Sequence, residues 1–85
     1  MAMAFDGKVL LITGGTGSFG HAVVDRFLST GIKEIRIVSR DEQKQDDMRK
    51  RYHNGKVKFY IGDVRDYASI ENAFRGVDFV FHASA

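Results

Sequence analysis

Three glycines spaced three residues apart stand near the start of the chain, directly after an apolar run. They are Gly14, Gly17 and Gly20 in the segment LLITGGTGSFGHAVV. In a turn that joins a strand to a helix, the first such glycine permits a tight turn and the second lets the backbone approach a pyrophosphate. The third lets the helix pack against the strand, and the helix N-terminus offers unpaired N–H groups to an anion. The spacing therefore predicts a dinucleotide site at this turn.

Two alternatives bear on the same segment. A tight strand-to-helix turn that binds no ligand needs the same glycines, and the spacing alone leaves it open. Gly15 and Gly20 have the separation found in loops that bind a nucleoside triphosphate. However, His21 and Ala22 stand where such a loop needs Lys and Ser or Thr, so it is excluded. The apolar run before the glycines and the helical pattern after them favour the dinucleotide.

Four polar residues after the second apolar run bear on which dinucleotide binds. They are Ser39, Arg40, Asp41 and Lys44. A carboxylate near this point suits the ribose 2′-hydroxyl of NAD, whereas an arginine suits the 2′-phosphate of NADP. Arg40 can pair bidentately with phosphate, Ser39 can donate a hydrogen bond to it, and Lys44 can add charge. NADP is therefore favoured, and Asp41 keeps NAD as the alternative. A structural role is also open, because Ser39 and Glu42 have the spacing of a helix capping box.

The ends of two further apolar runs point to the same cleft. Asp63 follows the third run, where its carboxylate can accept a hydrogen bond from an adenine amino group and Val64 can pack against the ring. A turn or helix N-cap role for Asp63 is equally consistent with the spacing. After the fourth run come Ala83, Ser84 and Ala85, whose small side chains would let a cofactor lie against the backbone.

The histidine and cysteine content argues against a metal centre. His21, His53 and His82 fall on three different predicted elements without ligand spacing, and the chain has no cysteine. We interpret His82 as a packed strand residue rather than a catalyst. The lack of cysteine also fits a reducing compartment. The N-terminal MAMAF lacks the basic segment and long apolar stretch of a signal peptide, and no apolar run is long enough to cross a bilayer. We therefore predict a cytoplasmic protein that spans no membrane.

The apolar patterning places all these residues on alternating strands and helices. Apolar runs predict strands over residues 8–13, 34–39, 56–61 and 78–82. Helical spacing predicts helices over residues 18–30, 41–52 and 68–74, the first ended by Gly31 as a C-terminal cap. Such an alternation implies a parallel sheet with right-handed crossovers. We predict an α/β, Rossmann-type three-layer fold, truncated to about four parallel strands in the order 3-2-1-4, with two helices on one face and the third on the other.

This arrangement leaves the fourth strand at an open edge of the sheet. A chain of 85 residues forms one domain at most and has a small core. We interpret residues 1–85 as the N-terminal part of an NAD(P)-binding Rossmann domain whose catalytic and sugar-binding parts are absent. The bare edge and the uncovered second face predict a homo-oligomer that pairs through the fourth strand.

A basic segment offers a rival function. The run MRKRYH over residues 48–53, with Lys56, Lys58 and nearby aromatic residues, resembles a patch that could hold nucleic acid. Asp46 and Asp47 precede it and the formal net charge is only +2, so a solvated helix face is the favoured interpretation. A self-associating half-domain that binds no ligand is the remaining alternative.

Four segments of the chain carry a resemblance to a known family. ITGGTGSFG, SRDEQKQDDMR, FYIGDVRD and VDFVFHASA resemble the opening of the extended short-chain dehydrogenase/reductase family. Within it, the chain is most similar to the bacterial UDP-N-acetylglucosamine 4,6-dehydratases of polysaccharide biosynthesis, including those that also epimerise at C5. The glycine motif is shared by the whole superfamily, whereas SRDEQKQDDMR is far more specific.

The resemblance implies an NADP cofactor held along one edge of the sheet. The cofactor phosphates would contact Thr16, Gly17, Ser18 and Phe19, the 2′-phosphate would contact Arg40 and Lys44, and the adenine would contact Asp63 and Val64. The segment HASA, residues 82–85, would lie near the nicotinamide ribose. Ser84 departs from the usual HAAA of the family and adds a hydroxyl beside the cofactor.

The resemblance also implies a reaction that these 85 residues cannot complete. Family members continue for several times this length, and their catalytic tyrosine–lysine pair and sugar-binding domain lie beyond Ala85. The parent lyase would take hydride from the sugar C4, eliminate water across C5 and C6, and return hydride to C6. We therefore expect no catalytic residue in this chain, no turnover by it alone, and UDP-sugar binding only in the full-length parent.

Overall fold

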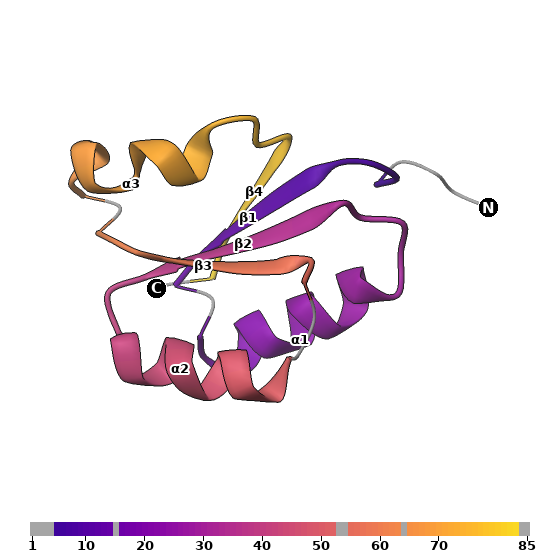
Figure 1. Ribbon diagram of the computed structural model, residues 1–85, viewed down its shortest axis with the longest axis horizontal. Helices are drawn as coiled ribbons and strands as arrows, with labels where there is room; N and C mark the ends of the chain where they lie inside the picture. Colours follow the sequence, from indigo (N-terminus) through magenta and orange to yellow (C-terminus); the bar gives the residue numbers. More distant parts are fainter. Residues whose placement is uncertain (1–4, 15, 53–54, 64, 84–85) are drawn as a thin grey trace.

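The computed structural model describes residues 5–14, 16–52, 55–63 and 65–83. Within these residues it confirms the predicted fold: a four-stranded parallel sheet in the order β3-β2-β1-β4 with three helices (Figure 1). Along the chain the elements are β1 (Val9–Thr13), α1 (Ser18–Leu28), β2 (Glu34–Ser39), α2 (Glu42–Arg51), β3 (Val57–Ile61), α3 (Tyr67–Phe74) and β4 (Phe79–His82). None of the described helices is long and apolar enough to span a membrane.

The parallel strands bring their carboxyl ends to one edge of the sheet. Thr13 of β1 stands level with Val38 of β2 and His82 of β4, and Val38 stands level with Tyr60 of β3. β1 is buried along its whole length because it has a strand on either side and side chains packed on both faces. The loops that follow the strands therefore share one side of the molecule.

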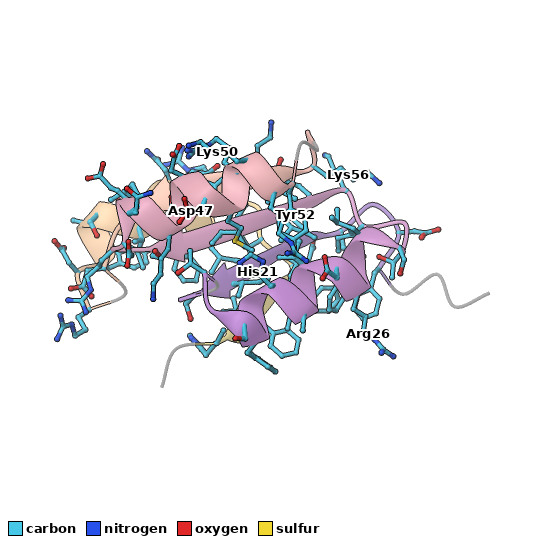
Figure 2. The ribbon with its side chains drawn as sticks, turned by 90° about the horizontal axis from the view of Figure 1, so that it is seen from below. His21, Arg26, Asp47, Lys50, Tyr52 and Lys56 are labelled. Atoms are coloured by element: carbon cyan, nitrogen blue, oxygen red, sulfur yellow. The ribbon has the colours of Figure 1, made fainter. Side chains whose placement is uncertain are left out.

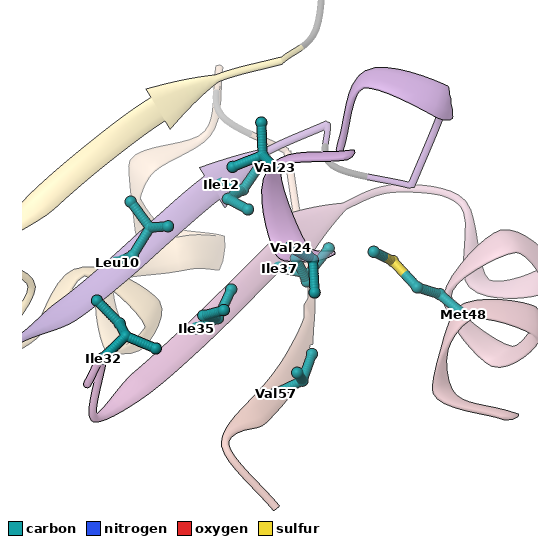
Figure 3. Close-up of a cluster of buried hydrophobic side chains, with 9 residues drawn as sticks. All are labelled: Leu10, Ile12, Val23, Val24, Ile32, Ile35, Ile37, Met48 and Val57. Atoms are coloured by element: carbon teal, nitrogen blue, oxygen red, sulfur yellow. The ribbon is translucent and has the colours of Figure 1, made fainter. Parts of the chain in front are cut away.

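Two apolar clusters hold the helices to opposite faces of the sheet. Leu10 and Ile12 of β1 pack with residues of α1 and α2, whereas Leu11 packs with Ile70 and Ala73 of α3. Figure 3 shows the larger cluster, and Figure 1 shows α1 and α2 on one side of the sheet with α3 on the other. Each fully buried Leu or Ile contributes roughly 1.5–3 kcal/mol to folding, so the alternation along β1 fixes the three-layer arrangement.

The predicted glycine cap of α1 is wrong. The helix ends at Leu28, and Gly31 is not among the positive-φ glycines of the described chain. Ser29 is the C-cap instead, and beyond it the backbone N–H and the hydroxyl of Thr30 both donate to the carbonyl oxygen of Phe27, at 3.0 and 2.6 Å. A Cβ at Gly31 would meet only the carboxylate of Asp6, the movable end of an exposed side chain.

The other element boundaries lie within one residue of the predicted ones, and β2 spans residues 34–39 as predicted. β1, β3 and β4 each begin one residue later than predicted, α3 begins one residue earlier, and α2 is one residue shorter at each end. Met48 is the apolar anchor of α2, since it is buried. Gln45 is a second, polar anchor, because its buried amide donates to the carbonyl oxygen of Tyr60 at 2.8 Å and so ties α2 to β3.

β4 is the exposed edge that the sequence predicts. It pairs with β1, and all four of its residues are exposed, including Phe79, Val80 and Phe81. Phe81 also meets the rings of Phe19 and Phe27 of α1, with centroids 6.2 and 6.3 Å apart. Three of the four exposed residues of β4 are therefore large hydrophobic residues, two of them aromatic.

Helices α1 and α2 also meet through a polar contact (Figure 2). The Tyr52 hydroxyl donates to the Asp25 carboxylate at 2.8 Å, and its ring lies 5.7 Å from that of His21. Burial, together with the hydrogen bond to Asp25, raises the pKa of the Tyr52 hydroxyl. Arg51 lies 3.7 Å from Asp25 as well, so the contact joins the end of α2 to the middle of α1.

Candidate functional site

The glycine segment forms the turn between β1 and α1. Gly14 has a φ of 64°, which favours glycine, and its N–H donates to the carbonyl oxygen of Val38 at 2.7 Å. Gly17 is the N-cap of α1 with a φ of −91°, a conformation open to other residues. A Cβ at Gly17 would meet no atom within 4 Å, so neither the backbone nor packing requires glycine there. Gly20 is buried within α1.

The N-terminus of α1 lacks the groups that cap α2. Among the described residues no side chain caps the N-terminus of α1, and the first turn of α1 carries no acidic residue. At α2, by contrast, Asp41 accepts a hydrogen bond from the Lys44 backbone N–H, and Glu42 stands in the first turn. The first N–H groups of a helix have no intrahelical partner and carry the positive end of its dipole. The N-terminus of α1 is therefore suited to an anion.

A cleft of about 930 Å³ opens beside this turn, across the ends of β1, β2 and β3. Seven predicted residues line it: Gly14, Thr16, Ser39, Arg40, Asp41, Lys44 and Asp63. Five others, Gly17, Ser18, Phe19, Gly20 and Ala83, do not belong to its lining. Val64, Ser84 and Ala85 lie outside the described residues. Thus the structure brings together the residues predicted for the adenosine half of a dinucleotide.

The end of β2 corrects the predicted capping box. Ser39 and Glu42 do not cap α2; the N-cap is Asp41, whose Oδ1 accepts from the Lys44 N–H at 3.0 Å. The Ser39 hydroxyl oxygen instead accepts from the Asp41 N–H at 3.0 Å. Asp41 occupies the cap because it directly precedes the helix, while Ser39 is still the last residue of the strand. Arg40 stands between them with 67% of its side chain exposed.

The Asp63 carboxylate is held chiefly by Arg65. Its Oδ1 accepts from the Arg65 backbone N–H at 2.9 Å and from Nε at 3.2 Å, and its Oδ2 accepts from Nη2 at 3.0 Å. Arg40 Nη1 lies 3.6 Å from the same Oδ2. These hydrogen bonds from Arg65 lower the pKa of Asp63 from 3.8 to about 2. The turn role considered for Asp63 is thus what its contacts show, while Asp66 is the N-cap of α3.

The end of β4 is tied to the end of β1. His82 Nδ1 lies 2.9 Å from the Thr13 hydroxyl oxygen, and the Ala83 N–H donates to the Thr13 carbonyl oxygen at 2.9 Å. His82 is exposed rather than packed, because β4 has no neighbour on its outer side in the described chain. No group of three or more His, Asp or Glu residues gathers as a metal site in the part of the chain that the structure describes.

Comparison with known proteins places the chain in a family. Residues 10–85 match the family model described as polysaccharide biosynthesis protein. The chain belongs to this family. It is 65% identical over 85 residues to the UDP-glucose 4-epimerase of Rickettsia conorii, an alignment that covers 95% of this chain and 25% of that protein. This member of the polysaccharide biosynthesis family thus spans about a quarter of the length of the curated relatives it matches.

Solved structures share its fold. Pen from Bacillus thuringiensis superposes with a TM-score of 0.89 at 35% identity, covering 98% of this chain and 26% of that one. A short-chain dehydrogenase/reductase from Burkholderia phymatum in complex with NAD gives a TM-score of 0.74 at 26% identity, covering 94% and 31%. These structures confirm the Rossmann-type fold of the polysaccharide biosynthesis family member. The curated relatives carry the name of an epimerase, whereas the sequence resemblance implied a 4,6-dehydratase.

Sequence reasoning missed three residues that line the cleft, namely Glu42, Gly62 and Arg65. Arg65 is the most consequential of them, since it engages the predicted adenine acceptor Asp63. The segment GDVRD offered a signal, because an arginine two residues after an aspartate in a turn can fold back onto its carboxylate. Gly62 packs closely, as a Cβ there would lie 2.4 Å from Cγ2 of Ile70.

The basic run expected as a solvated helix face carries its own counter-charges. Asp46 lies 3.5 Å from Arg49 and 3.1 Å from Lys50, and Asp25 lies 3.7 Å from Arg51. The Arg49 guanidinium also stacks over the Phe59 ring, 4.8 Å from its centroid. These contacts reduce the positive potential that nucleic-acid phosphates would meet.

Proposed function

We propose that the chain forms the NADP-binding part of a nucleotide-sugar-modifying enzyme that acts in polysaccharide biosynthesis. The observation that carries the proposal is the cleft across the carboxyl ends of β1, β2 and β3, bordered by the uncapped N-terminus of α1. Ligands of open parallel sheets bind at this edge. The family match and the NAD complex of the Burkholderia phymatum neighbour agree with a dinucleotide.

The residues present fit the two halves of such a cofactor. The pyrophosphate would rest on the backbone from Thr16 to Phe19, where the open space at Gly17 admits a close approach. The adenosine would extend over the ends of β2 and β3, toward Arg40 and Asp63. When bound, the nicotinamide supplies an acceptor for hydride from the sugar. This chain binds and orients the cofactor through its backbone N–H groups and its cationic side chains.

The exposure and the hydrogen bonds of the side chains that follow β2 support NADP over NAD. Arg40 is largely exposed and lines the cleft together with Lys44, so both can meet a 2′-phosphate. Asp41, which would bind the ribose 2′-hydroxyl of NAD, already has Oδ1 committed to the helix cap. NAD is the competing cofactor, because the Burkholderia phymatum structure contains it.

For the reaction, we propose 4,6-dehydration of UDP-N-acetylglucosamine, on the strength of the segment SRDEQKQDDMR. The second candidate is UDP-glucose 4-epimerisation, which the 65% identity to the Rickettsia conorii protein favours. Both reactions act on a UDP-hexose at C4 of the sugar. Product analysis of the full-length enzyme separates them, since dehydration gives a product lighter by one water and epimerisation conserves mass.

The division between this chain and its parent is also a proposal. Residues 1–85 would form the N-terminal part of the cofactor domain, in the cytoplasm, while the catalytic residues and the sugar site would belong to the rest of the parent enzyme. The chain alone would bind cofactor without turnover. The free edge of β4, with Phe79 and Phe81 exposed, supports self-association of the isolated chain.

Calorimetric titration of the purified chain with NADP and NAD, combined with light scattering, tests the proposal. We expect NADP to bind more tightly than NAD and the chain to have the mass of an oligomer. Tighter binding of NAD would contradict the role given to Arg40. Binding of neither dinucleotide would contradict the cofactor site itself, and a stable monomer would contradict pairing through β4.

A further inference from the structure

We propose that Arg65 determines cofactor specificity by occupying the Asp63 carboxylate, which leaves Arg40 available to the 2′-phosphate of NADP. Arg65 would therefore be a positioning residue that acts through Asp63 rather than through contact with the chemistry. The inference rests on the proposed dinucleotide site. It adds to that site a residue that belongs neither to the glycine segment nor to the polar residues that follow β2.

The contacts divide unequally between the two arginines. Arg65 reaches both carboxylate oxygens of Asp63 through three hydrogen bonds of 2.9 to 3.2 Å. Arg40 makes one longer approach, 3.6 Å from Nη1 to Oδ2. Charged hydrogen bonds are strongest when short and bidentate. The carboxylate is therefore satisfied by Arg65, and Arg40 can leave it for a ligand phosphate at little cost.

The origin of the two arginines in the fold supports this assignment. Arg65 follows Asp63 by two residues in one turn, and its backbone N–H takes part in the contact, so the pair forms locally. Arg40 comes from the loop after the neighbouring strand β2 and lines the same cleft. A local partner needs less ordering than one from another strand. Arg65 is thus the resident partner of Asp63.

The charge balance of the cleft gives the inference its consequence. Among the described residues that line it, three cations face three carboxylates: Arg40, Lys44 and Arg65 against Asp41, Glu42 and Asp63. Loss of Arg65 would leave the lining net negative, and it would release Asp63 to draw Arg40 away from the ligand. A 2′-phosphate would then meet a repelling carboxylate. NAD carries no phosphate at this position, so the affinity for NAD should not fall with the affinity for NADP.

Calorimetry on four variants tests the inference. R65Q should weaken NADP binding by about two- to fivefold, the effect expected for the loss of an exposed ion pair, and should leave NAD binding unchanged. D63N/R65Q should restore the wild-type ratio of NADP to NAD affinity, because it removes the carboxylate that Arg65 neutralises, whereas loss of the adenine contact at Asp63 weakens both dinucleotides alike. R40Q should weaken NADP whether or not Arg65 is present. R75Q is the matched control, since it removes the same charge at a residue outside the cleft lining and should change neither affinity.

A readout without ligand accompanies the titrations. In an NMR pH titration of the Asp63 carboxyl, R65Q should raise the pKa from about 2 toward its ordinary value, and R40Q should raise it less. An equal loss of affinity for NADP and NAD in R65Q, no recovery of the NADP-to-NAD affinity ratio in the double variant, or a larger pKa shift in R40Q than in R65Q would overturn the inference. If the wild-type chain binds NADP and R65Q binds it equally well, only this inference fails. If the wild-type chain binds neither dinucleotide, the proposed function fails and the inference falls with it.

Discussion

Two glycines of one motif should respond to substitution in opposite ways. Gly14 has a φ of 64°, so an alanine there would hold its Cβ in the left-handed region. That strain costs about 1–2 kcal/mol, and G14A should lower the Tm by roughly 4–16 °C for a domain of this size. Gly17 has a φ of −91° and open space around its missing Cβ. G17A should therefore leave the free energy of unfolding within about 0.5 kcal/mol of wild type, because reduced unfolded-state entropy offsets the poorer N-cap.

For dinucleotide affinity, in contrast to stability, we expect the effect of substitution at Gly17. The open space at Gly17 is where a pyrophosphate would approach the N-terminus of α1, so a methyl group there should weaken NADP by about tenfold, equivalent to about 1.4 kcal/mol. Circular-dichroism melts and calorimetric titrations of wild type, G14A and G17A measure both effects. The reasoning is refuted if G17A binds NADP as tightly as wild type, or if it loses as much stability as G14A.

Two further predictions concern the loop after β3. G62A should destabilise the fold by about 1–3 kcal/mol through overpacking, because its Cβ would lie 2.4 Å from Cγ2 of the buried Ile70. G55A, whose Cβ would meet nothing within 4 Å, is the control in the same melts and should match wild type. Hydrogen bonds from Arg65 lower the pKa of Asp63 to about 2, so its stabilising contribution is present above its ordinary value of 3.8 and is lost as the pH falls through about 2. Urea midpoints measured between about pH 5 and pH 2 should fall less steeply in R65Q, and an unchanged slope would contradict this prediction.

The layers and the strand order followed from the sequence because burial dictates them. β1 is buried along its whole length, and the continuous apolar run from Val9 to Ile12 is the pattern that a strand with both faces covered requires. Right-handed crossovers then leave few arrangements for three short helices. The order β3-β2-β1-β4 needs no side-chain detail beyond this pattern.

The helix ends and the side-chain pairings could not be predicted from the sequence, because neighbouring residues compete for the same role. Ser39 and Asp41 are both suitable caps for α2, and only the point where β2 stops decides between them. Gly31 looks like a helix cap, but α1 ends earlier, at Leu28 with Ser29 as its C-cap. The link between Arg65 and Asp63 depends on the turn that brings them together, which no pattern of residue types specifies.

The N-termini of the three described helices differ in the charge that they present to an anion. The N-cap of α2 is Asp41 and that of α3 is Asp66, so a carboxylate already stands at the positive end of each dipole. The N-cap of α1 is Gly17, which carries neither a charge nor a side chain. A phosphate approaching the carboxyl edge of the sheet is therefore attracted at α1 and opposed at the other two. On this argument the identity of residue 17 sets both the place and the sign of the ligand, and a carboxylate introduced by G17D should cap α1, stabilise the fold and abolish dinucleotide binding.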